Sequence, residues 1–578
     1  MSDKPRKPVK RAPKKAPTKK AAAKKVAPVP PAKKASKLAP SFKAAVKNIA
    51  TYGDTDIFPF SFEQHIFYDQ PELIQGALEV IHADFEAQLA QNPPDNINTL
   101  APVGYTGYRW AAQLDPLWNA YYLSLVIEMG PDIEAARVPV SEETIFSYRF
   151  VKPTEDGSIF NADVNWRAFM AKSQEVASLK TDEGNTVYPY VLVCDISDFY
   201  SRIYHHRIEN ALKWLRAKPE TVKRIVDILK VFSGIVSYGL PVGGPASRLL
   251  AELALNSVDK LLRGEGIRFC RFVDDYRIFC ATKEEAYQRL IFLSEKLFNE
   301  GLSLQKNKTR ILTSKEFMDE TKLLVKADQI DEDNLSDEDK LLRLSIHFDP
   351  YSDTRVDDYE NLKEQVSQVD VAGIIGRELE KTRIDPTITK QAISAIRVLE
   401  ADAQKNIIAS LLQIDNLHTL APVFPRLMTV LRGLYMDLDE ETRDLIDYGL
   451  SNLIRNESHI MQVDLNLAYA IQVMRRRCTQ KTEALFVQIF KKCTSPLVRR
   501  EIMIAWAGWQ HNHSLTDLKK NFGALSKWER RAFIVGSYIL TDEGKHWRDH
   551  NKKSFDPLEG VVRDWFAKRM NENRDVPL

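Results

Sequence analysis

The apolar pattern between residues 188 and 315 predicts a small sheet. The segment YPYVLVCDI is a continuous apolar strand that ends at Asp195. In FCRFVDDYRIFC, residues 269–280, residues typical of strands alternate between two faces on both sides of two aspartates. This alternation predicts a tight hairpin with Asp274 and Asp275 at its tip. The segment LSLQKNKTRIL then adds a strand, a basic turn and another strand.

Helical periodicity separates these strands. Apolar residues recur at helical spacing in HRIENALKWLRAKPETVKRIVDILKVF and in LLAELALNSVDKLL. A third segment, EEAYQRLIFLSEKLFNEG, has acids in its first turn and a glycine at its end, as helices favour. This order of elements predicts an α+β domain in which helices cover one face of a single antiparallel sheet.

Beyond about residue 371, nearly every segment has helical periodicity. Segments such as SPLVRREIMIAWAGWQ and SKWERRAFIVGSYIL recur at similar size. They predict stacked helical pairs, a HEAT-like solenoid over residues 371–578, with an irregular helical bundle as the alternative. The acidic segment ADQIDEDNLSDEDK lies in residues 316–370, which we predict to be a surface connection between the two parts.

Charge is distributed unevenly along the chain. Residues 1–40 contain 14 Lys and Arg and a single acid, so their net charge is +13, whereas the remaining residues carry −11. This mixture of Lys, Ala and Pro lacks the residues of a core, which predicts a disordered basic tail. Such a tail suits the phosphates of a nucleic acid. A solubilising tail without a dedicated partner is the alternative.

Length and composition restrict the class of protein. A chain of 578 residues predicts two or three folded domains, and a hydrophobic content of 44% is that of a globular protein. Because no apolar run is long enough to cross a bilayer or to act as a secretion signal, we expect a cytoplasmic protein without a membrane partner. Five cysteines without CxxC spacing favour reduced thiols over disulfides or a zinc site.

Three aspartates are candidate metal ligands. If the strand that ends at Asp195 neighbours the acidic hairpin, the carboxylates of Asp195, Asp274 and Asp275 converge at one rim of the sheet. Oxygen-only clusters of this kind suit Mg²⁺, which prefers a few carboxylates, waters and substrate phosphates. Two such ions, about 4 Å apart, serve phosphoryl transfer in polymerases and nucleases. For each aspartate alone, a turn or capping role is the alternative.

The order of these motifs resembles that of reverse transcriptases. DISDFY, GLPVGGPASR and FVDDY are similar to the catalytic motifs of that family, with FVDD in place of YxDD. DISDFYSRIYHH, the glycine loop, SYRF at residues 147–150 and the helical tail resemble the bacterial defence-associated branch, the abortive-infection (AbiK-like) enzymes. The resemblance implies a right-hand polymerase fold, with a fingers-like region at residues 41–185 and a palm at residues 186–315, followed by the all-α domain.

The resemblance also implies the metal ligands. Asp195 and Asp274 would bind two Mg²⁺ ions, with Mn²⁺ as an alternative ion. The backbone carbonyl of Ile196 would complete a site, and Asp275 would be the third catalytic acid.

Nucleotide-binding residues follow from the same resemblance. Tyr200, five positions after Asp195, corresponds to the aromatic gate that clashes with a ribose 2′-OH, with a core aromatic as the alternative. Gly243, Gly244 and Ser247 lie on the loop that passes along the incoming nucleotide. Val242 replaces the usual Gln of this loop. Templated and untemplated synthesis therefore both stay open.

Basic residues near the triphosphate are implied at two places. Arg149 and Lys152 lie in SYRFVKP, and Lys306 and Lys308 lie in the QKNKT turn. A guanidinium group matches phosphate geometry well. A solvated surface charge is the alternative for each residue.

The sequence therefore predicts a nucleotidyltransferase. The leading hypothesis is a reverse-transcriptase-type DNA polymerase of bacterial antiphage defence, which adds dNTPs to a 3′ hydroxyl or a protein hydroxyl. Its partners would be dNTPs, a DNA product and, if synthesis is templated, an RNA template. We also expect the protein to form a homo-oligomer. The alternatives are a non-catalytic scaffold that binds nucleic acid on a degenerate palm, and a retron-like enzyme that copies a dedicated RNA.

Overall fold

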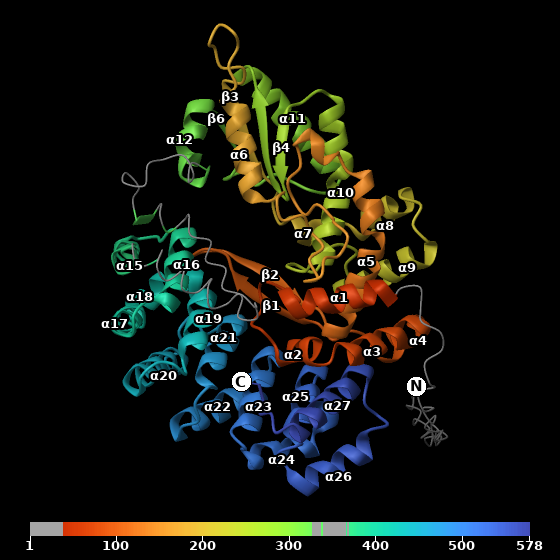
Figure 1. The fold of residues 1–578 in the computed structure, drawn as a ribbon, viewed down its shortest axis with the longest axis vertical. Helices are drawn as coiled ribbons and strands as arrows, with labels where there is room; N and C mark the ends of the chain where they lie inside the picture. Colours follow the sequence, from red (N-terminus) through yellow and green to blue (C-terminus); the bar gives the residue numbers. More distant parts are fainter. Residues whose placement is uncertain (1–38, 326–336, 339–340, 342–365, 367–368, 578) are drawn as a thin grey trace, which may run out of the picture. The chain divides into compact units, whose positions relative to one another are not determined.

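A four-stranded antiparallel sheet carries the acidic motifs (Figure 1). The computed structural model of the protein describes residues 39–325, 337–338, 341, 366 and 369–577. The strand order is β4-β5-β3-β6. The strands are β3 (Tyr190–Asp195), β4 (Phe269–Phe272), β5 (Asp275–Cys280) and β6 (Arg310–Thr313). The predicted hairpin and the strand that ends at Asp195 are thus confirmed. Residues 1–38 of the predicted basic tail lie outside the described residues, and its last two, Ala39 and Pro40, already belong to a helix.

Helices cover both faces of this sheet, so the prediction of a single covered face is wrong. Val191 and Val193 belong to a buried cluster that includes residues of α6 (Trp166–Ala177) and α12 (Ser314–Val325). Leu192 and Cys194 point the other way, because neighbouring side chains of a strand alternate between its faces. The opposite face is covered by α11 (Lys283–Asn299), with α10 (Pro245–Gly264) beside it.

Proline interrupts one of the predicted helices. The segment HRIENALKWLRAKPETVKRIVDILKVF forms two helices, α8 (His205–Trp214) and α9 (Pro219–Ser233). The break follows from Pro219, which disfavours helical backbone at the residue before it and starts the next helix. The short helix α7 (Phe199–Arg202) precedes this pair and carries the end of the DISDFY motif.

The N-terminal region combines helices with a two-stranded ribbon. β1 and β2 pair in antiparallel fashion, and Pro102 faces Tyr108 next to the turn. The helix α5 is buried on nearly all sides, which explains its nearly continuous apolar sequence. The elements are α1 (Ala39–Tyr52), α2 (Phe62–Asp69), α3 (Pro71–Ala83), α4 (Phe85–Gln91), β1 (Ile97–Pro102), β2 (Tyr108–Gln113), α5 (Pro116–Ala136) and the 3-10 turn η1 (Val140–Glu142).

The C-terminal part is helical from Val371 onward, as predicted. Its elements are α15 (Val371–Glu380), α16 (Pro386–Ala395), η4 (Ile396–Val398), α17 (Ala401–Leu411), α18 (Ile414–Thr419), η5 (Ala421–Val423), α19 (Phe424–Leu434), α20 (Glu440–Arg455), α21 (Asp464–Met474), α22 (Gln480–Lys492), α23 (Pro496–Gly508), α24 (Asn512–Lys520), η6 (Phe522–Ala524), α25 (Lys527–Gly536), α26 (Thr541–Asn551) and α27 (Pro557–Asn571). Contacts run in one row from α16 through α19, α21, α23 and α25 to α27. One such row is the packing of a helical solenoid.

This row of helices packs against the N-terminal region. Arg531 of α25 is fully buried and binds Glu63 at 3.0 Å and Asp115 at 2.8 Å. The Trp528 indole N–H donates a hydrogen bond of 2.7 Å to the carbonyl of Asp95. The described residues from Ala39 onward accordingly belong to one compact unit. Part of the solenoid surface is therefore covered by the chain itself.

Two simpler expectations concern membranes and thiols. Within the described ranges, we find no helix that combines the length and the apolar character of a membrane span. All five cysteines are free thiols.

Candidate active site

The three predicted acids lie at one rim of the sheet. Because β3 and β5 are antiparallel neighbours, Asp195 lies directly opposite Asp275 in the register. Asp274 occupies the turn before β5, and its carbonyl accepts a hydrogen bond of 3.1 Å from the backbone N–H of Ile196. We call Asp195, Asp274 and Asp275 the carboxylate rim.

The turn that presents Asp274 is strained. Phe272 pairs with Asp275, so the two central residues are Val273 and Asp274 rather than the two aspartates. Val273 has a φ of +56°, and a positive φ at the first central residue alone is the pattern of a type II′ turn, which favours glycine. A β-branched residue in this conformation costs about 1–3 kcal/mol. Surrounding interactions must therefore hold the turn.

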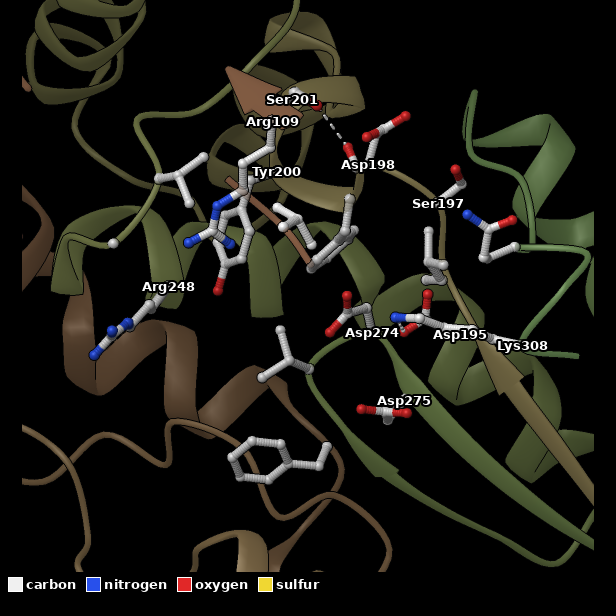
Figure 2. Close-up of a pocket in the computed structure, with 18 of the residues that line it drawn as sticks. Arg109, Asp195, Ser197, Asp198, Tyr200, Ser201, Arg248, Asp274, Asp275 and Lys308 are labelled. Carbon is white, nitrogen blue, oxygen red and sulfur yellow. Dashed lines mark hydrogen bonds and ion pairs between the residues drawn. The ribbon is translucent and has the colours of Figure 1, made fainter. Parts of the chain in front are cut away.

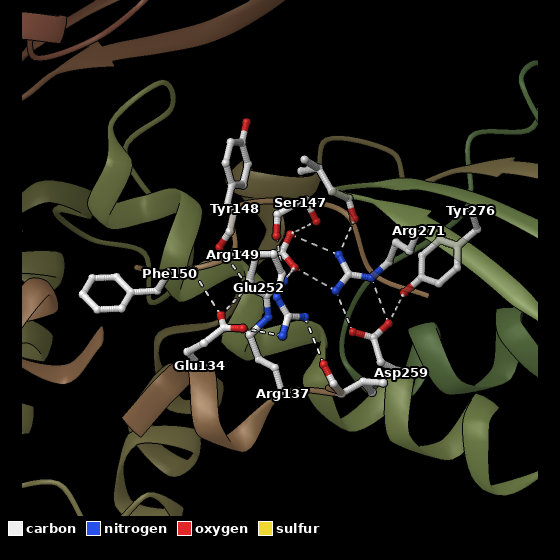
Figure 3. Close-up of polar contacts among 12 residues, drawn as sticks. Glu134, Arg137, Ser147, Tyr148, Arg149, Phe150, Glu252, Asp259, Arg271 and Tyr276 are labelled. Carbon is white, nitrogen blue, oxygen red and sulfur yellow. Dashed lines mark hydrogen bonds and ion pairs between the residues drawn. The ribbon is translucent and has the colours of Figure 1, made fainter. Parts of the chain in front are cut away.

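Arg271 supplies the interaction that holds it. Its guanidinium donates a hydrogen bond of 2.8 Å to the carbonyl of Val273. The same guanidinium forms paired hydrogen bonds with Glu252 at 2.9 and 3.1 Å and with Asp259 at 2.6 and 2.8 Å (Figure 3). Glu252 and Asp259 are seven residues apart on α10, which places them on one helical face.

Burial makes these contacts strong. The side chain of Arg271 has no solvent exposure, and those of its two acidic partners have at most 1%. Burial alone would lower the pKa of Arg271, but Asp259 and Glu252 raise this pKa well above its usual value. Arg271 therefore stays charged and ties the acidic turn to α10.

A second arginine extends this network to the SYRF element. Arg137 binds Glu252 at 2.5 Å and donates to the carbonyls of Ser147 and Tyr148, both at 2.8 Å. The Ser147 hydroxyl donates to Glu252 at 2.6 Å. Tyr148 has a φ of +43°, so these bonds also hold a strained backbone. We call Arg137, Ser147, Glu252, Asp259 and Arg271 the Arg271 network.

The carboxylate rim opens into a cavity of about 680 Å³. Figure 2 shows Asp195, Asp274, Asp275 and Lys308 along one side of this cavity. On the other side lie three further lining residues, Arg109, Tyr200 and Arg248. Acids and bases therefore face each other across a space large enough for a nucleotide.

Negative charge dominates one side of the cavity. Burial and the neighbouring Asp275 and Asp195 raise the pKa of Asp274 to about 7. Burial also raises the pKa of Asp275, although Arg277, 3.3 Å away, opposes this. Lys308 forms an ion pair of 3.0 Å with Asp195. Three carboxylates thus have only two nearby cations. Their negative charge is not fully neutralised, so a bound cation would be favoured.

The donor chemistry of this rim fits Mg²⁺. In the part of the chain that the structure describes, no three carboxylate, imidazole or thiolate groups form a complete metal cluster. Mg²⁺ does not need one, because it binds through one or two carboxylates and takes its other ligands from water and phosphates. Asp195 and Asp274 supply hard oxygen donors, and Ile196 lines the same cavity.

Residues of the predicted nucleotide loop lie in two places. Gly243 lines the main cavity with a φ of +97°, and a Cβ there would lie 2.5 Å from a carboxylate oxygen of Asp56. Only glycine fits this position. Gly244 and Ser247 instead line a small neighbouring cavity, and Ser247 is 1% exposed. The structure thus brings Gly243 to the acids but not the other two.

The structure places the predicted basic residues apart. Lys308 meets Asp195 at the rim. Arg149 is buried, pairs with Glu134 and donates 3.0 Å to the carbonyl of Val138. Lys152 lies with Arg149 in a separate cavity. Lys306 is exposed in the turn that precedes β6. The acid on α5 therefore draws Arg149 away from the carboxylate rim.

Two cavity-lining arginines were not predicted. Arg248 binds Asp56 at 2.9 Å, and its guanidinium lies 5.1 Å from the ring centre of Tyr148. Its place in the first turn of α10, directly after the glycine loop, was a usable signal. Arg109 comes from β2, far from the motifs in sequence. The flanking glycines in GYTGYRW indicate a hairpin, but no local pattern shows where its tip lies.

Comparison with known families identifies part of the chain. Residues 145–347 match the family model described as reverse transcriptase (RNA-dependent DNA polymerase). The chain carries a reverse transcriptase domain. The predicted enzyme class, a nucleotidyltransferase, and the predicted polymerase fold are thereby confirmed. The match concerns the family as a whole, and the defence-associated branch stays a prediction.

Solved structures of telomerases also resemble the chain. One, from Candida albicans with a fragment of telomeric RNA, is 10% identical over 62% of this chain, with a TM-score of 0.28. The chain spans 66% of that protein, just under two thirds. Apo telomerase from Candida tropicalis gives the same identity and TM-score over 69% of this chain and 74% of its own. No curated protein matches.

The residues that match the reverse transcriptase family include the whole palm predicted at residues 186–315 and part of the fingers-like region predicted before it. The match begins before the SYRF element and includes α6, both of which precede residue 186. Most of the Arg271 network lies inside it, and Arg137 lies shortly before its first residue. All of the network except Arg137 is therefore internal to the domain that carries the carboxylate rim.

Replacing Arg271 by Lys tests whether the network positions the turn. Lysine keeps the charge but loses the paired hydrogen bonds and the bond to Val273. We expect a folded protein whose kcat for dNTP incorporation falls at least about tenfold, equivalent to about 1.4 kcal/mol, with little change in KM for the nucleotide. Arg263→Lys, an exposed position on the same helix, is the control. A folded Arg271→Lys variant with wild-type kcat would contradict this role.

Proposed function

We propose that this protein is a DNA polymerase that adds dNTPs to a 3′ hydroxyl with the help of two divalent metal ions. The observation that carries the proposal is the carboxylate rim, where three acids share one cavity and Asp274 has a pKa of about 7. Asp195 and Asp274 would hold the ions, together with the carbonyl of Ile196. Asp275 adds negative charge to the same rim.

Each part of the cavity has a task in this reaction. Bound Mg²⁺ would activate the attacking hydroxyl and stabilise the leaving pyrophosphate. Lys308 holds Asp195 before substrate binds and can then contact phosphate oxygens. Arg109 and Arg248 lie opposite the rim, where guanidinium groups suit a triphosphate. Gly243 leaves space for the nucleotide.

Tyr200 supports a preference for deoxyribonucleotides. It lies on α7 and lines the cavity opposite the carboxylate rim. Burial raises its pKa well above the usual value, so the phenol stays neutral. A neutral, half-buried ring at this place would exclude a sugar that carries a 2′-OH.

Asp274→Asn provides the direct test of catalysis. The amide keeps the shape of the side chain but removes its charge. Because metal ions contribute several kcal/mol of transition-state stabilisation, we expect Mg²⁺-dependent incorporation of labelled dNTPs to fall on the order of a thousandfold. Asp198→Asn is the control, since Asp198 is exposed in the same cavity and its φ of +51° suits Asn.

Equal activity of wild type and Asp274→Asn would exclude the carboxylate rim as the catalytic site. Absence of incorporation by the wild-type protein with every primer, and without one, would favour the non-catalytic scaffold.

Tyr200→Val tests the sugar selectivity. Removal of the ring opens space beside the 2′ position, so we expect the ratio of rNTP to dNTP incorporation to rise at least about tenfold, equivalent to about 1.4 kcal/mol. The same substitution at Tyr287, exposed on α11, should leave the ratio unchanged. An unchanged ratio in an active Tyr200→Val variant would leave Tyr200 as a packing residue.

Template use separates two forms of this function. Val242 lines the cavity where the glycine loop of relatives carries Gln, so the motif supports neither form by itself. Sequencing the DNA made with defined RNA templates and without any template distinguishes them. Products complementary to the template indicate RNA-directed synthesis, including a retron-like activity. Products without relation to the template indicate untemplated extension of a 3′ hydroxyl or a protein hydroxyl.

We further infer a role in bacterial antiphage defence, in the cytoplasm and as a homo-oligomer. The resemblance of DISDFYSRIYHH, the glycine loop and the helical tail to abortive-infection enzymes supports this role. Phage plating on cells that express wild type or Asp274→Asn tests it, and equal plating would contradict it. Light scattering on the purified protein gives the oligomeric state.

A further inference from the structure

Three cations from different parts of the chain interact electrostatically, and one of them, Arg109, lines the active-site cavity. They are Arg109 on the ribbon strand β2, Lys390 on α16 and Arg426 on α19. Arg109 and Lys390 are exposed, and Arg426 is half-buried. None of the three has an ion pair with a carboxylate of the described residues. We call Arg109, Lys390 and Arg426 the cation row.

The ribbon strand that carries Arg109 is bonded to the solenoid that carries Lys390 and Arg426. The tip of the β1–β2 ribbon reaches the solenoid beside α16 and α19 (Figure 1). There the Tyr105 hydroxyl donates 2.7 Å to the carbonyl of Thr419 and accepts 3.0 Å from the N–H of Ile384. Arg426 is oriented by a bond of 2.7 Å from its Nε to the Ser394 hydroxyl. Hydrogen bonds therefore join the tip of the ribbon, which carries Arg109, to the part of the solenoid that carries Lys390 and Arg426.

The row is a region of uncompensated positive charge. Although Lys390 is exposed overall, partial burial of its ammonium group lowers its pKa, and Arg109 and Arg426 lower this pKa further. Burial also lowers the pKa of Arg426. Neither shift includes a contribution from a carboxylate. Cations that repel each other without a nearby acid favour a polyanionic ligand.

Aromatic side chains accompany this charge. Tyr108 and Trp110 flank Arg109 on the ribbon and are 51% and 62% exposed. All three also line the cavity that contains the carboxylate rim. Exposed aromatic rings next to cations are the combination with which proteins bind single-stranded nucleic acids, by stacking bases and contacting phosphates.

We propose that the cation row binds the sugar–phosphate backbone of a single nucleic-acid strand that connects with the active-site cavity, with Tyr108 and Trp110 stacking on its bases. The strand is DNA if it is the product and RNA if it is the template. The assignment of the strand as product or template rests on the proposed polymerase function. The binding itself needs no catalysis and can be measured separately.

A double variant of the solenoid cations tests this inference. Fluorescence anisotropy would measure binding of labelled oligo-dT and oligo-U, each of about 20 nucleotides, to the full chain without Mg²⁺ or dNTPs. Each phosphate contact in a single strand contributes about 0.7 to the slope of log K against log salt. Lys390→Gln with Arg426→Gln should therefore reduce this slope by about 1.4 and weaken binding roughly tenfold near 0.15 M salt.

Matched variants distinguish a loss of binding at this site from a general loss of positive charge and from misfolding. Lys481→Gln with Lys491→Gln removes two exposed charges from α22 and should leave the slope unchanged. Lys390→Arg with Arg426→Lys keeps both charges and should retain binding. A loss with oligo-dT alone indicates a DNA product, and a loss with oligo-U alone indicates an RNA template.

Two results would overturn the inference. One is unchanged binding of both oligonucleotides by the folded Lys390→Gln/Arg426→Gln variant, and the other is an equal loss in the α22 control. Neither result affects the proposed polymerase activity, which the Asp274→Asn assay measures independently. Conversely, an inactive wild-type protein whose cation row still binds a strand would contradict only the proposed polymerase activity.

Discussion

The buried contact between Arg271 and two acids of α10 is the interaction on which the candidate active site depends. It joins the helix that follows the glycine loop to the turn that carries Asp274. A buried ion pair contributes little net stability, because desolvation of the charges offsets their attraction. Its value here is geometric, since the same guanidinium also bonds the carbonyl of the strained Val273.

Two concentrations of charge then organise the space around this turn. The carboxylate rim is negative, and burial together with Asp275 and Asp195 raises the pKa of Asp274. Arg109 and Arg248 face the rim across the cavity, and the cation row continues from Arg109 to the solenoid. A polyanionic strand and a triphosphate can therefore meet the same rim from different sides. The helical C-terminal part contributes to this arrangement because the β1–β2 ribbon is bonded to it through Tyr105.

The sequence predicted what depends on local pattern. Alternation in FCRFVDDYRIFC gave the hairpin, and the strand before Asp195 became its neighbour because both belong to one small sheet. Helical periodicity gave the start of the C-terminal part at Val371. Pro219 could have predicted the break between α8 and α9, but the helical periodicity continues across it.

What the sequence did not predict depends on contacts between distant segments. The second covered face of the sheet comes from α6, which precedes the sheet, and from α12, which follows it, and neither helix carries a motif. Arg149 was expected at the triphosphate, but Glu134 on α5 pairs with it elsewhere. Arg109 reaches the cavity only through the position of the ribbon, and Ser247 turns into the packing beside Gly244. No spacing rule contains such information.

The central claim is that the carboxylate rim, held by Arg271, is a divalent-cation site. Titration of the purified protein with Mn²⁺, followed by electron paramagnetic resonance, tests it without any need for catalysis. We predict that wild type and Asp198→Asn bind Mn²⁺ with the same affinity, and that Asp195→Asn and Arg271→Lys bind it at least about tenfold more weakly, equivalent to about 1.4 kcal/mol. Equal Mn²⁺ binding by all four folded proteins would contradict the account.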